Sequence, residues 1–456
     1  MSVMLNNNPR VRISDRLERL PHAPYLILLG GLVLMANFIE NIDMHGLGYL
    51  LPVLSQYWHM DPKITGYLGS TNFIGMFFGA ITCGYLADRF GRKPVLMAAM
   101  VIWGIAGLLF AMSWSVQAVF ICRFIFGVGM GAQVPVATSM LSEMVPSRLR
   151  AKYIAFFIAT LPLGIAASGL LNFLFFPYLG WRGMFVLEAL FALWVVVLWK
   201  YLPESALWLE FKGRYSEADK SMTQLEKGIE KNIGRTLPAV EAKYSDNPDQ
   251  EIDPETAKKY STFRELFSRR YIKTTIMCTI WMSTTMMAYY GLGTWLTSLL
   301  VLKGFVVIKS IGYVSLINLG GIPAFFLISY LVEKIGRKWL IVIMAVLTAV
   351  TAYVYGQSTV YAMVIATGLL YMFCQHGLNQ SNQAYLPELF ETRLRGSGVG
   401  YTSACGRLGA ASGSIIIGYL LASYGPSAVM VFALAINLLS AVTIAVLGHE
   451  TKGKVF

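Results

Sequence analysis

Long apolar segments alternate with short polar segments along most of the chain, as Tyr25–Ile39 and Trp339–Tyr355 illustrate. A helix that crosses a bilayer needs about 20 mostly apolar residues. Its backbone groups must be paired internally, because lipid offers no hydrogen-bonding partner. Strands of a membrane barrel would alternate apolar and polar residues, whereas these segments are continuously apolar. The pattern therefore predicts an all-α membrane protein.

We expect twelve transmembrane helices in two halves of six. The expected spans are 25–51, 65–86, 94–113, 117–141, 153–177, 183–201, 272–299, 310–332, 339–357, 360–384, 396–422 and 427–447. The polar segment between the sixth and seventh spans predicts a linker with short helices, since fewer than about 70 residues support only a marginal core. The expected parts are a cytoplasmic segment (1–24), a first half (25–202), a linker (203–271), a second half (272–448) and a tail (449–456).

The composition excludes a water-soluble globule. Of the 456 residues, 56% are hydrophobic and 14% are charged, whereas a soluble protein carries about 25% charged residues. The five cysteines are odd in number and all fall in expected spans. They indicate packing residues and not a disulfide framework or a metal site. We expect no cofactor, no metal and a monomer.

Basic residues are concentrated in alternate loops, which changes the meaning of the net charge of +12. A basic protein can bind nucleic acid, but here the charges flank spans, as at Arg92, Arg148, Arg337 and Arg395. This is the positive-inside distribution of membrane proteins. We therefore expect a multi-pass protein of a bacterial inner membrane, with both termini and the linker in the cytoplasm. The lipid bilayer, and not nucleic acid, is the expected macromolecular environment.

Two charged motifs occur twice along the chain. Asp88–Lys93 returns as Glu333–Lys338, and Glu143 returns as Glu388 after the same sequence separation. One separation shared by two motifs indicates the duplication of a six-helix unit. Repeats of this kind place a substrate site near the midplane, between the halves.

The first motif, Gly84–Lys93, resembles the loop motif of the major facilitator superfamily, and the likeness covers nearly the whole chain. The resemblance implies the major facilitator fold and a secondary transporter that works by alternating access. The expected gating residues are Asp88, Arg89, Arg92, Glu143, Arg148, Glu204, Glu333, Arg337, Glu388 and Arg393. The alternative is that these charged loops only set the topology.

A narrower resemblance concerns three other segments. Pro203–Leu209 and His449–Gly453 look like motifs of sugar porters, with His449 where proline is usual, and Arg123 precedes a run of spaced glycines in the fourth span. Sugar porters, organic-ion transporters and aromatic-acid symporters share these motifs. They indicate the branch of the superfamily and leave the substrate open.

Arg407 lies in the middle of the eleventh expected span, where a charge costs about 3 kcal/mol or more. It should therefore face the cavity between the halves. The segment Arg395–Gly409 is similar to organic-ion carriers, in which anion carriers hold a cation at this position. The resemblance implies that Arg407 binds a carboxylate; the alternative is a structural arginine paired with an acidic residue of another helix.

Glu40 and Asp43 are one helical turn apart in the first span and share a face. Two carboxylates in a medium of low dielectric repel each other, which favours a proton on one of them. Such a pair suits proton coupling, and it resembles the acidic motif of aromatic-acid and nicotinate transporters, where aspartate is usual in place of Glu40. The alternative is that one of the two only neutralises Arg407 or Arg123.

The tenth span carries polar side chains at spacings of three and four, which predicts a face that lines a cavity or holds two helices together. The expected substrate-binding residues are Arg407, Gln133, Tyr289, Tyr290, Gln375, Asn379 and Gln383. His376 lies in the same span and is either a helix contact or a proton relay.

These features favour a proton-coupled symporter that imports a small organic anion, such as an aromatic carboxylate. The alternatives are a sugar or polyol symporter, an efflux carrier for organic cations or drugs, and, from a different class, a transporter-like nutrient sensor. Sensors of that kind carry long cytoplasmic tails, and the polar ends here are short. An enzyme is not expected, because we find no phosphate loop, metal cluster or nucleophile–base set.

Overall fold

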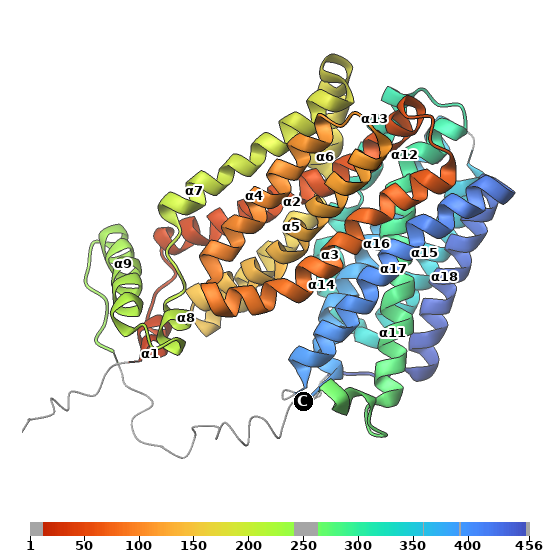
Figure 1. The fold of residues 1–456 in the computed structure, drawn as a ribbon. Coiled ribbons are helices and arrows are strands. Elements are labelled where there is room, and N and C mark those ends of the chain that lie inside the picture. Colours follow the sequence, from red (N-terminus) through yellow and green to blue (C-terminus); the bar gives the residue numbers. More distant parts are fainter. Residues whose placement is uncertain (1–11, 241–262, 359, 392–393, 453–456) are drawn as a thin grey trace, which may run out of the picture.

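The computed structural model describes residues 12–240, 263–358, 360–391 and 394–452 (Figure 1). Within these ranges the chain is almost entirely helical. The helices of residues 24–201 pack together as a first half, and those of residues 272–447 pack together as a second half.

The first half contains four long helices and a kinked pair. Its elements are α1 (Ile13–Glu18), α2 (Pro24–Tyr57), α3 (Pro62–Phe90), α4 (Arg92–Ala111), α5 (Val116–Met144), α6 (Ser147–Leu190), η1 (Phe191–Leu193) and α7 (Trp194–Tyr201), followed in the linker by α8 (Ala206–Phe211) and α9 (Tyr215–Ile233). Short polar residues set some of the boundaries, because they accept from free N–H groups of a first helical turn. Asp61 accepts from the Ile64 amide at 2.7 Å before α3, and Ser115 accepts from the Ala118 amide at 3.2 Å before α5.

The second half has two helices that are interrupted within the bundle. Its elements are η3 (Phe263–Phe267), α11 (Ile272–Met286), η4 (Met287–Leu292), α12 (Gly293–Leu302), α13 (Val307–Asn318), α14 (Gly321–Ile335), α15 (Arg337–Gln357), α16 (Tyr361–Tyr385), η5 (Leu386–Leu389), α17 (Arg395–Tyr424) and α18 (Pro426–Leu447). The π-helical segment η4 separates α11 from α12, and a break separates α13 from α14. The sequence predicts unbroken spans at both places, because an apolar pattern reports length and not the register of backbone hydrogen bonds.

Ten helices in the described part of the chain are long and apolar enough to cross a membrane. One of them, Ser147–Tyr201, is 55 residues long and contains Gly180 at a φ of 61°, where the chain kinks and a second pass begins. The helix α3 has 29 residues, but its glycine and polar residues keep it out of the apolar set. Counting both passes and α3, the described residues contain the twelve expected membrane helices in two groups of six.

The two halves meet at one end of the bundle. We call the end at which α4, α6, α15 and α17 begin the basic end, and the opposite one the far end. Near the far end, a Cβ atom on Gly66 would lie 2.7 Å from the carbonyl oxygen of Ser414, and one on Gly418 would lie 2.4 Å from that of Pro62. Only glycine permits such close approach. We call this contact between α3 and α17 the far-end seam.

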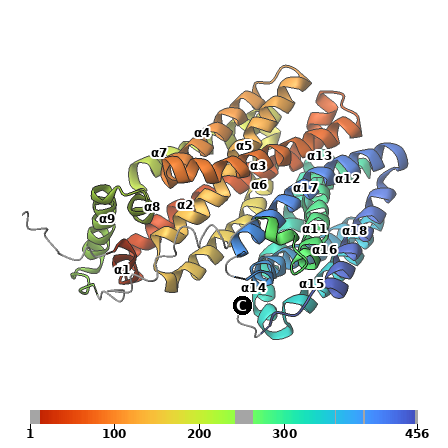
Figure 2. The ribbon, with the colours of Figure 1, turned by 60° about the horizontal axis from the view of Figure 1, so that its bottom comes forward.

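At the basic end the halves separate. Figure 1 and Figure 2 both show them converging near α12 and α13 and spreading apart toward α8 and the start of α11. A Cβ atom on Gly84, Gly396 or Gly400 would have nothing within 4 Å, and the Tyr85 side chain is 66% exposed. The structure is therefore closed at the far end and open at the basic end.

The closure of the far end can be tested by removing one hydrogen bond across the far-end seam. The hydroxyl groups of Tyr67 in α3 and Tyr419 in α17 lie 2.9 Å apart. Tyr67→Phe removes this bond, and a hydrogen bond of this kind contributes about 1 kcal/mol. We expect the ratio of closed to open far end to fall about fivefold, measured by electron–electron distances between spin labels at positions 114 and 424, both exposed at the far end.

Tyr178→Phe is the control, because its side chain is 85% exposed at the same end of the bundle. An unchanged distance distribution in Tyr67→Phe would contradict a role for this bond in closure.

Candidate functional site

A cavity lies between the halves, midway along the bundle. It encloses about 670 Å³, counting its open mouth. The helices α2, α3, α5 and α6 of the first half and η4, α12, α13 and α16 of the second contribute its walls. Its polar and aromatic lining includes His45, Asn72, Arg123, Tyr289, Tyr290 and His376. We call it the central cavity.

The two helix interruptions open onto the central cavity. The π-helical segment η4 brings both Tyr289 and Tyr290 into its lining, and Asn318, the last residue of α13, lines it as well. Single π-helical turns occur frequently at functional sites, and irregular backbone within a membrane bundle is tolerated where it borders a cavity. The interruptions are therefore features of a site and not defects of packing.

Several polar atoms in this lining are buried without a partner. Within the described residues, Tyr289 Oη, His376 Nε2, Asn72 Oδ1 and Arg123 Nε have no hydrogen bond. Each of these side chains is at most 7% exposed. A buried polar group without a partner costs about 1–3 kcal/mol, so the lining is arranged to receive a polar molecule.

Two acidic residues and one arginine form a buried cluster beside the cavity. Asp43, Arg123 and Glu188 are each at most 2% exposed. The carboxyl groups of Asp43 and Glu188 lie against each other, and the Arg123 guanidinium lies within electrostatic range of both. Gly46 makes room for this cluster, because a Cβ atom there would lie 2.4 Å from Glu188 Oε2.

Neighbouring groups hold the members of this cluster in place. Arg123 donates to the Met44 carbonyl at 3.3 Å, and its guanidinium lies 4.3 Å from the centre of the Phe126 ring. Glu188 accepts from the Asn172 amide at 3.2 Å. The cluster is therefore a rigid charged feature of the first half, and Arg123 extends it into the cavity lining.

His45 adds a hydrogen-bond acceptor to the same wall. Its Nδ1 lies 2.9 Å from the Asn41 carbonyl, which can only accept, so Nδ1 carries the hydrogen. In the neutral ring, Nε2 is then an acceptor. The imidazole stacks on Tyr290 with ring centres 6.3 Å apart.

Glu40 and Arg407 lie on opposite halves, outside the lining of the central cavity. Glu40 is 2% exposed, and Arg407 lies within electrostatic range of Glu40 and of Tyr290. In the described part of the chain, Arg407 makes no ion pair within 4.0 Å and no hydrogen bond. Glu40 and Asp43 therefore face different arginines, although they are one turn apart.

The structure distributes the expected substrate-binding residues over three places. Tyr289 and Tyr290 line the central cavity, whereas Asn379 and Gln383 line a second, smaller cavity together with His376. Gln133 is fully buried in the first half, where it accepts from the Trp103 indole at 2.7 Å and donates to a backbone carbonyl.

Gln375 and Arg407 lie outside both cavities in this conformation. The sequence shows that a residue is polar within a span, but it does not show which partner the side chain finds.

Sequence reasoning missed two residues of this site. Glu188 interrupts the sixth expected span, and an ionisable residue within a span is by default a functional candidate. His45 lies two residues after Asp43, and its contacts with Asn41 and Tyr290 become visible only in the fold. The sequence therefore marks Glu188 as a functional candidate, but it contains no feature that marks His45 as one.

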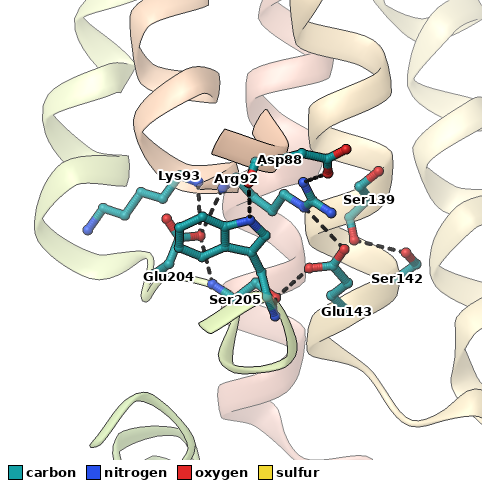
Figure 3. Close-up of polar contacts among 9 residues, drawn as sticks. Asp88, Arg92, Lys93, Ser139, Ser142, Glu143, Glu204 and Ser205 are labelled. Carbon is teal, nitrogen blue, oxygen red and sulfur yellow. Dashed lines mark hydrogen bonds and ion pairs between the residues drawn. The ribbon is translucent and has the colours of Figure 1, made fainter. Parts of the chain in front are cut away.

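A second feature is an ion-pair network at the basic end of the first half (Figure 3). Arg92 pairs with Asp88 at 2.6 Å and with Glu143 at 3.2 Å. Glu204 accepts from the Arg92 backbone amide at 3.1 Å at the start of α4, and Ser205 donates to Glu143. The network joins α3, α4 and α5 to the beginning of the linker.

The second half repeats this network. Arg337 pairs with Glu333 at 3.2 Å and with Glu388 at 3.2 Å. Glu450 accepts from the Arg337 backbone amide at 3.0 Å, and Thr451 donates to Glu388 at 2.5 Å. Each contact has its counterpart in the first half, so the sequence repeat is also a repeat of geometry.

Two of the expected gating residues make contacts outside these networks. Arg89 donates to the Tyr85 hydroxyl at 3.1 Å, and Arg148 donates to the Leu20 carbonyl at 2.7 Å. Neither contact belongs to the networks. Arg393 lies outside the described residues.

Glu204 and Glu450, which accept from the first backbone amides of α4 and α15, differ in their electrostatic surroundings. Burial raises the pKa of Glu204 above its ordinary value, against the opposing effect of the backbone N–H groups that it accepts from. Burial acts in the same direction on Glu450, but there the N–H donors prevail and its pKa is lowered. Glu204 is therefore the more easily protonated of the two.

Glu143 should contribute more to stability than Asp88, although both pair with Arg92. The side chain of Glu143 is 20% exposed and that of Asp88 is 70% exposed. We expect Glu143→Gln to lower the free energy of unfolding by about 1–3 kcal/mol, and Asp88→Asn to lower it by less than about 1 kcal/mol. Thermal unfolding in mild detergent measures both.

Glu217→Gln is the control, because Glu217 pairs with Arg214 on the exposed surface of the linker. Equal shifts for Glu143→Gln and Asp88→Asn would contradict this ranking.

Comparison with known proteins gives a consistent result. The chain is 31% identical to the niacin transporter NiaP of Acinetobacter baylyi over 96% of this chain and 98% of that protein. It is 29% identical to the 4-hydroxybenzoate transporter PcaK of Pseudomonas aeruginosa over 91% of this chain and 92% of that protein. The inward-open xylose transporter XylE of E. coli has a TM-score of 0.72 at 18% identity, covering 94% of this chain and 98% of that one. Residues 33–332 and 313–455 match the Major Facilitator Superfamily, and the chain belongs to this family of membrane transporters.

Proposed function

We propose that this transporter is a proton-coupled symporter that imports a small aromatic carboxylate. The observation that carries the proposal is the buried contact of Asp43, Glu188 and Arg123 at the wall of a cavity with aromatic lining. The names of two relatives support the substrate class, because niacin and 4-hydroxybenzoate are both planar rings with one carboxylate.

The basic end is proposed to face the cytoplasm, with both termini and the linker on that side. The positive-inside distribution supports this orientation. A cysteine introduced as Lys227→Cys on α9 should react with an impermeant maleimide only after cells are opened, whereas Trp114→Cys at the far end should react in intact cells. Both side chains are exposed. Labelling of position 227 from outside intact cells would overturn this orientation.

The aromatic ring is proposed to lie against Tyr289 and Tyr290 in the central cavity. Ring–ring contacts of this kind contribute about 0.5–1.5 kcal/mol beyond the buried area. Arg407 lies within electrostatic range of Tyr290 and outside the cavity lining in this conformation. Because it has no ion pair within the described residues, its planar guanidinium is free to take up a carboxylate with two hydrogen bonds. The charge of Arg123, by contrast, already faces two acidic residues.

Proton coupling is proposed to reside in the Asp43–Glu188 pair. Two carboxyl groups in contact repel when both are ionised, so the pair favours one bound proton. Arg123 favours the ionised form of either. When the halves rock open at the other end, a change in water access to this pair would load or release the proton. Glu40, which faces Arg407, is the alternative proton site.

Purified protein in liposomes tests the proposal. An inward proton gradient should drive accumulation of labelled nicotinate or 4-hydroxybenzoate, and neither xylose nor a quaternary amine should accumulate. Asp43→Asn should abolish accumulation, because no proton is released inside, while exchange of internal for external substrate persists. Accumulation that survives both Asp43→Asn and Glu40→Gln, singly and combined, would rule out these coupling sites.

Arg407→Ala in the same vesicles tests the carboxylate partner. We expect transport to be lost while the protein still folds, since Arg407 has no ion pair to lose among the residues that the structure describes. Arg407→Lys keeps the charge without the forked donors and should weaken binding about tenfold or more. A fully active Arg407→Ala would remove Arg407 from the binding site, and selective uptake of a neutral sugar would overturn the anion proposal.

A further inference from the structure

A second cavity lies beside the central cavity, toward the basic end. It measures about 340 Å³, counting its open mouth, and lies between α6 of the first half and α14 and α16 of the second. Its lining includes Pro162, Gly321, Phe325, His376, Asn379 and Gln383. No lysine, arginine, aspartate or glutamate lines it, so its polar character comes from the imidazole of His376 and from amide groups. We call it the amide cavity.

His376 belongs to the linings of both cavities. Its ring lies against the break between α13 and α14, where a Cβ atom on Gly321 would be 2.5 Å from Cδ2 of the imidazole. The side chain is 6% exposed, and its Nε2 has no partner within the described residues. Tyr289 contacts the same ring edge to face, with centres 5.5 Å apart. The imidazole is therefore the wall that the two cavities share.

The amide side chains continue from this wall toward the basic end. His376, Asn379 and Gln383 are spaced by three and four residues along α16, so they share one face of the helix. Asn379 is 8% exposed. An amide group offers two N–H donors and one carbonyl acceptor, so this face can exchange hydrogen bonds with a polar molecule that moves along it.

We infer that the amide cavity is a release subsite for the carboxylate substrate, occupied after the central cavity and before the open basic end. This inference rests on the proposed function. Amide N–H groups solvate a carboxylate and thus lower the cost of leaving the central cavity. Their hydrogen bonds are roughly half as strong as those from a guanidinium. A transit site must bind well enough to admit its ion and weakly enough to let it go, and uncharged donors meet both conditions.

The inference predicts a change in turnover without a change in affinity. Asn379→Leu and Gln383→Leu replace the amides by apolar groups of similar size. The maximal rate of uptake into liposomes should fall about fivefold to tenfold in each. The equilibrium Kd for nicotinate, measured by protein fluorescence in detergent, should stay within twofold, because the central cavity is unchanged.

Asn382→Leu is the matched control. Asn382 lies on the same helix, is fully buried, and lines neither cavity. Both its rate and its Kd should stay within twofold of the unsubstituted protein. If a leucine variant fails to fold, Gln383→Glu keeps the size and polarity of the side chain, and its negative charge should lower the rate at least as much.

The possible results of these measurements distinguish a failure of the release subsite from a failure of the proposed function. A weaker Kd with an unchanged rate would assign Asn379 and Gln383 to the central site and overturn the release subsite. Unchanged rate and Kd would remove the amide cavity from the path. In both cases the unsubstituted protein still transports nicotinate, so the proposed function stands. An unsubstituted protein that neither binds nor transports an aromatic carboxylate would overturn the function and the subsite together.

Discussion

An ionised group is expensive in the interior of a membrane bundle, and this cost determines how the charges of the first half are arranged. Asp43, Glu188 and Arg123 are almost fully buried and lie together, so each lowers the cost of another. Glycine at position 46 is required for Glu188 to reach the group. The helices α2, α5 and α6 are thus held in one arrangement around a shared electrostatic centre, and the central cavity is built onto its edge.

The same cost explains why the second half is organised differently. Its part of the cavity is formed by aromatic residues, amides and helix interruptions, while Arg407 stands without an ion pair within the described residues. The buried charges of the first half compensate one another, so that half can move as a unit. The second half carries a cation without an ion pair among the described residues, so an anionic ligand stabilises it. The two halves share their basic-end networks, contact by contact, so the duplication is retained at the basic end and has diverged at the central cavity.

Much of the fold could be predicted from the sequence. Apolar segments of span length, the asymmetry of basic residues and the repeat of Asp88–Lys93 gave the membrane helices and their arrangement in two groups. Hydrophobic pattern carries no information about backbone register, so neither the π-helical segment nor the break before Gly321 was foreseen. For the site, Tyr289 and Tyr290 were predicted as substrate-binding residues, and both line the central cavity. Glu188 was overlooked, and Gln133 finds its partners within the first half, since polarity within a span does not specify the partner.

At Gly66 and Gly418 the far-end seam packs backbone against backbone. No side chain lies between the helices at these glycines, so α3 and α17 can separate there without a rotamer change. A methyl group added at one of these glycines would keep the two helices of the far-end seam apart and hold the protein open at that end, whatever lies in the cavity. The smallest residues of the chain thereby set how freely the carrier can cycle.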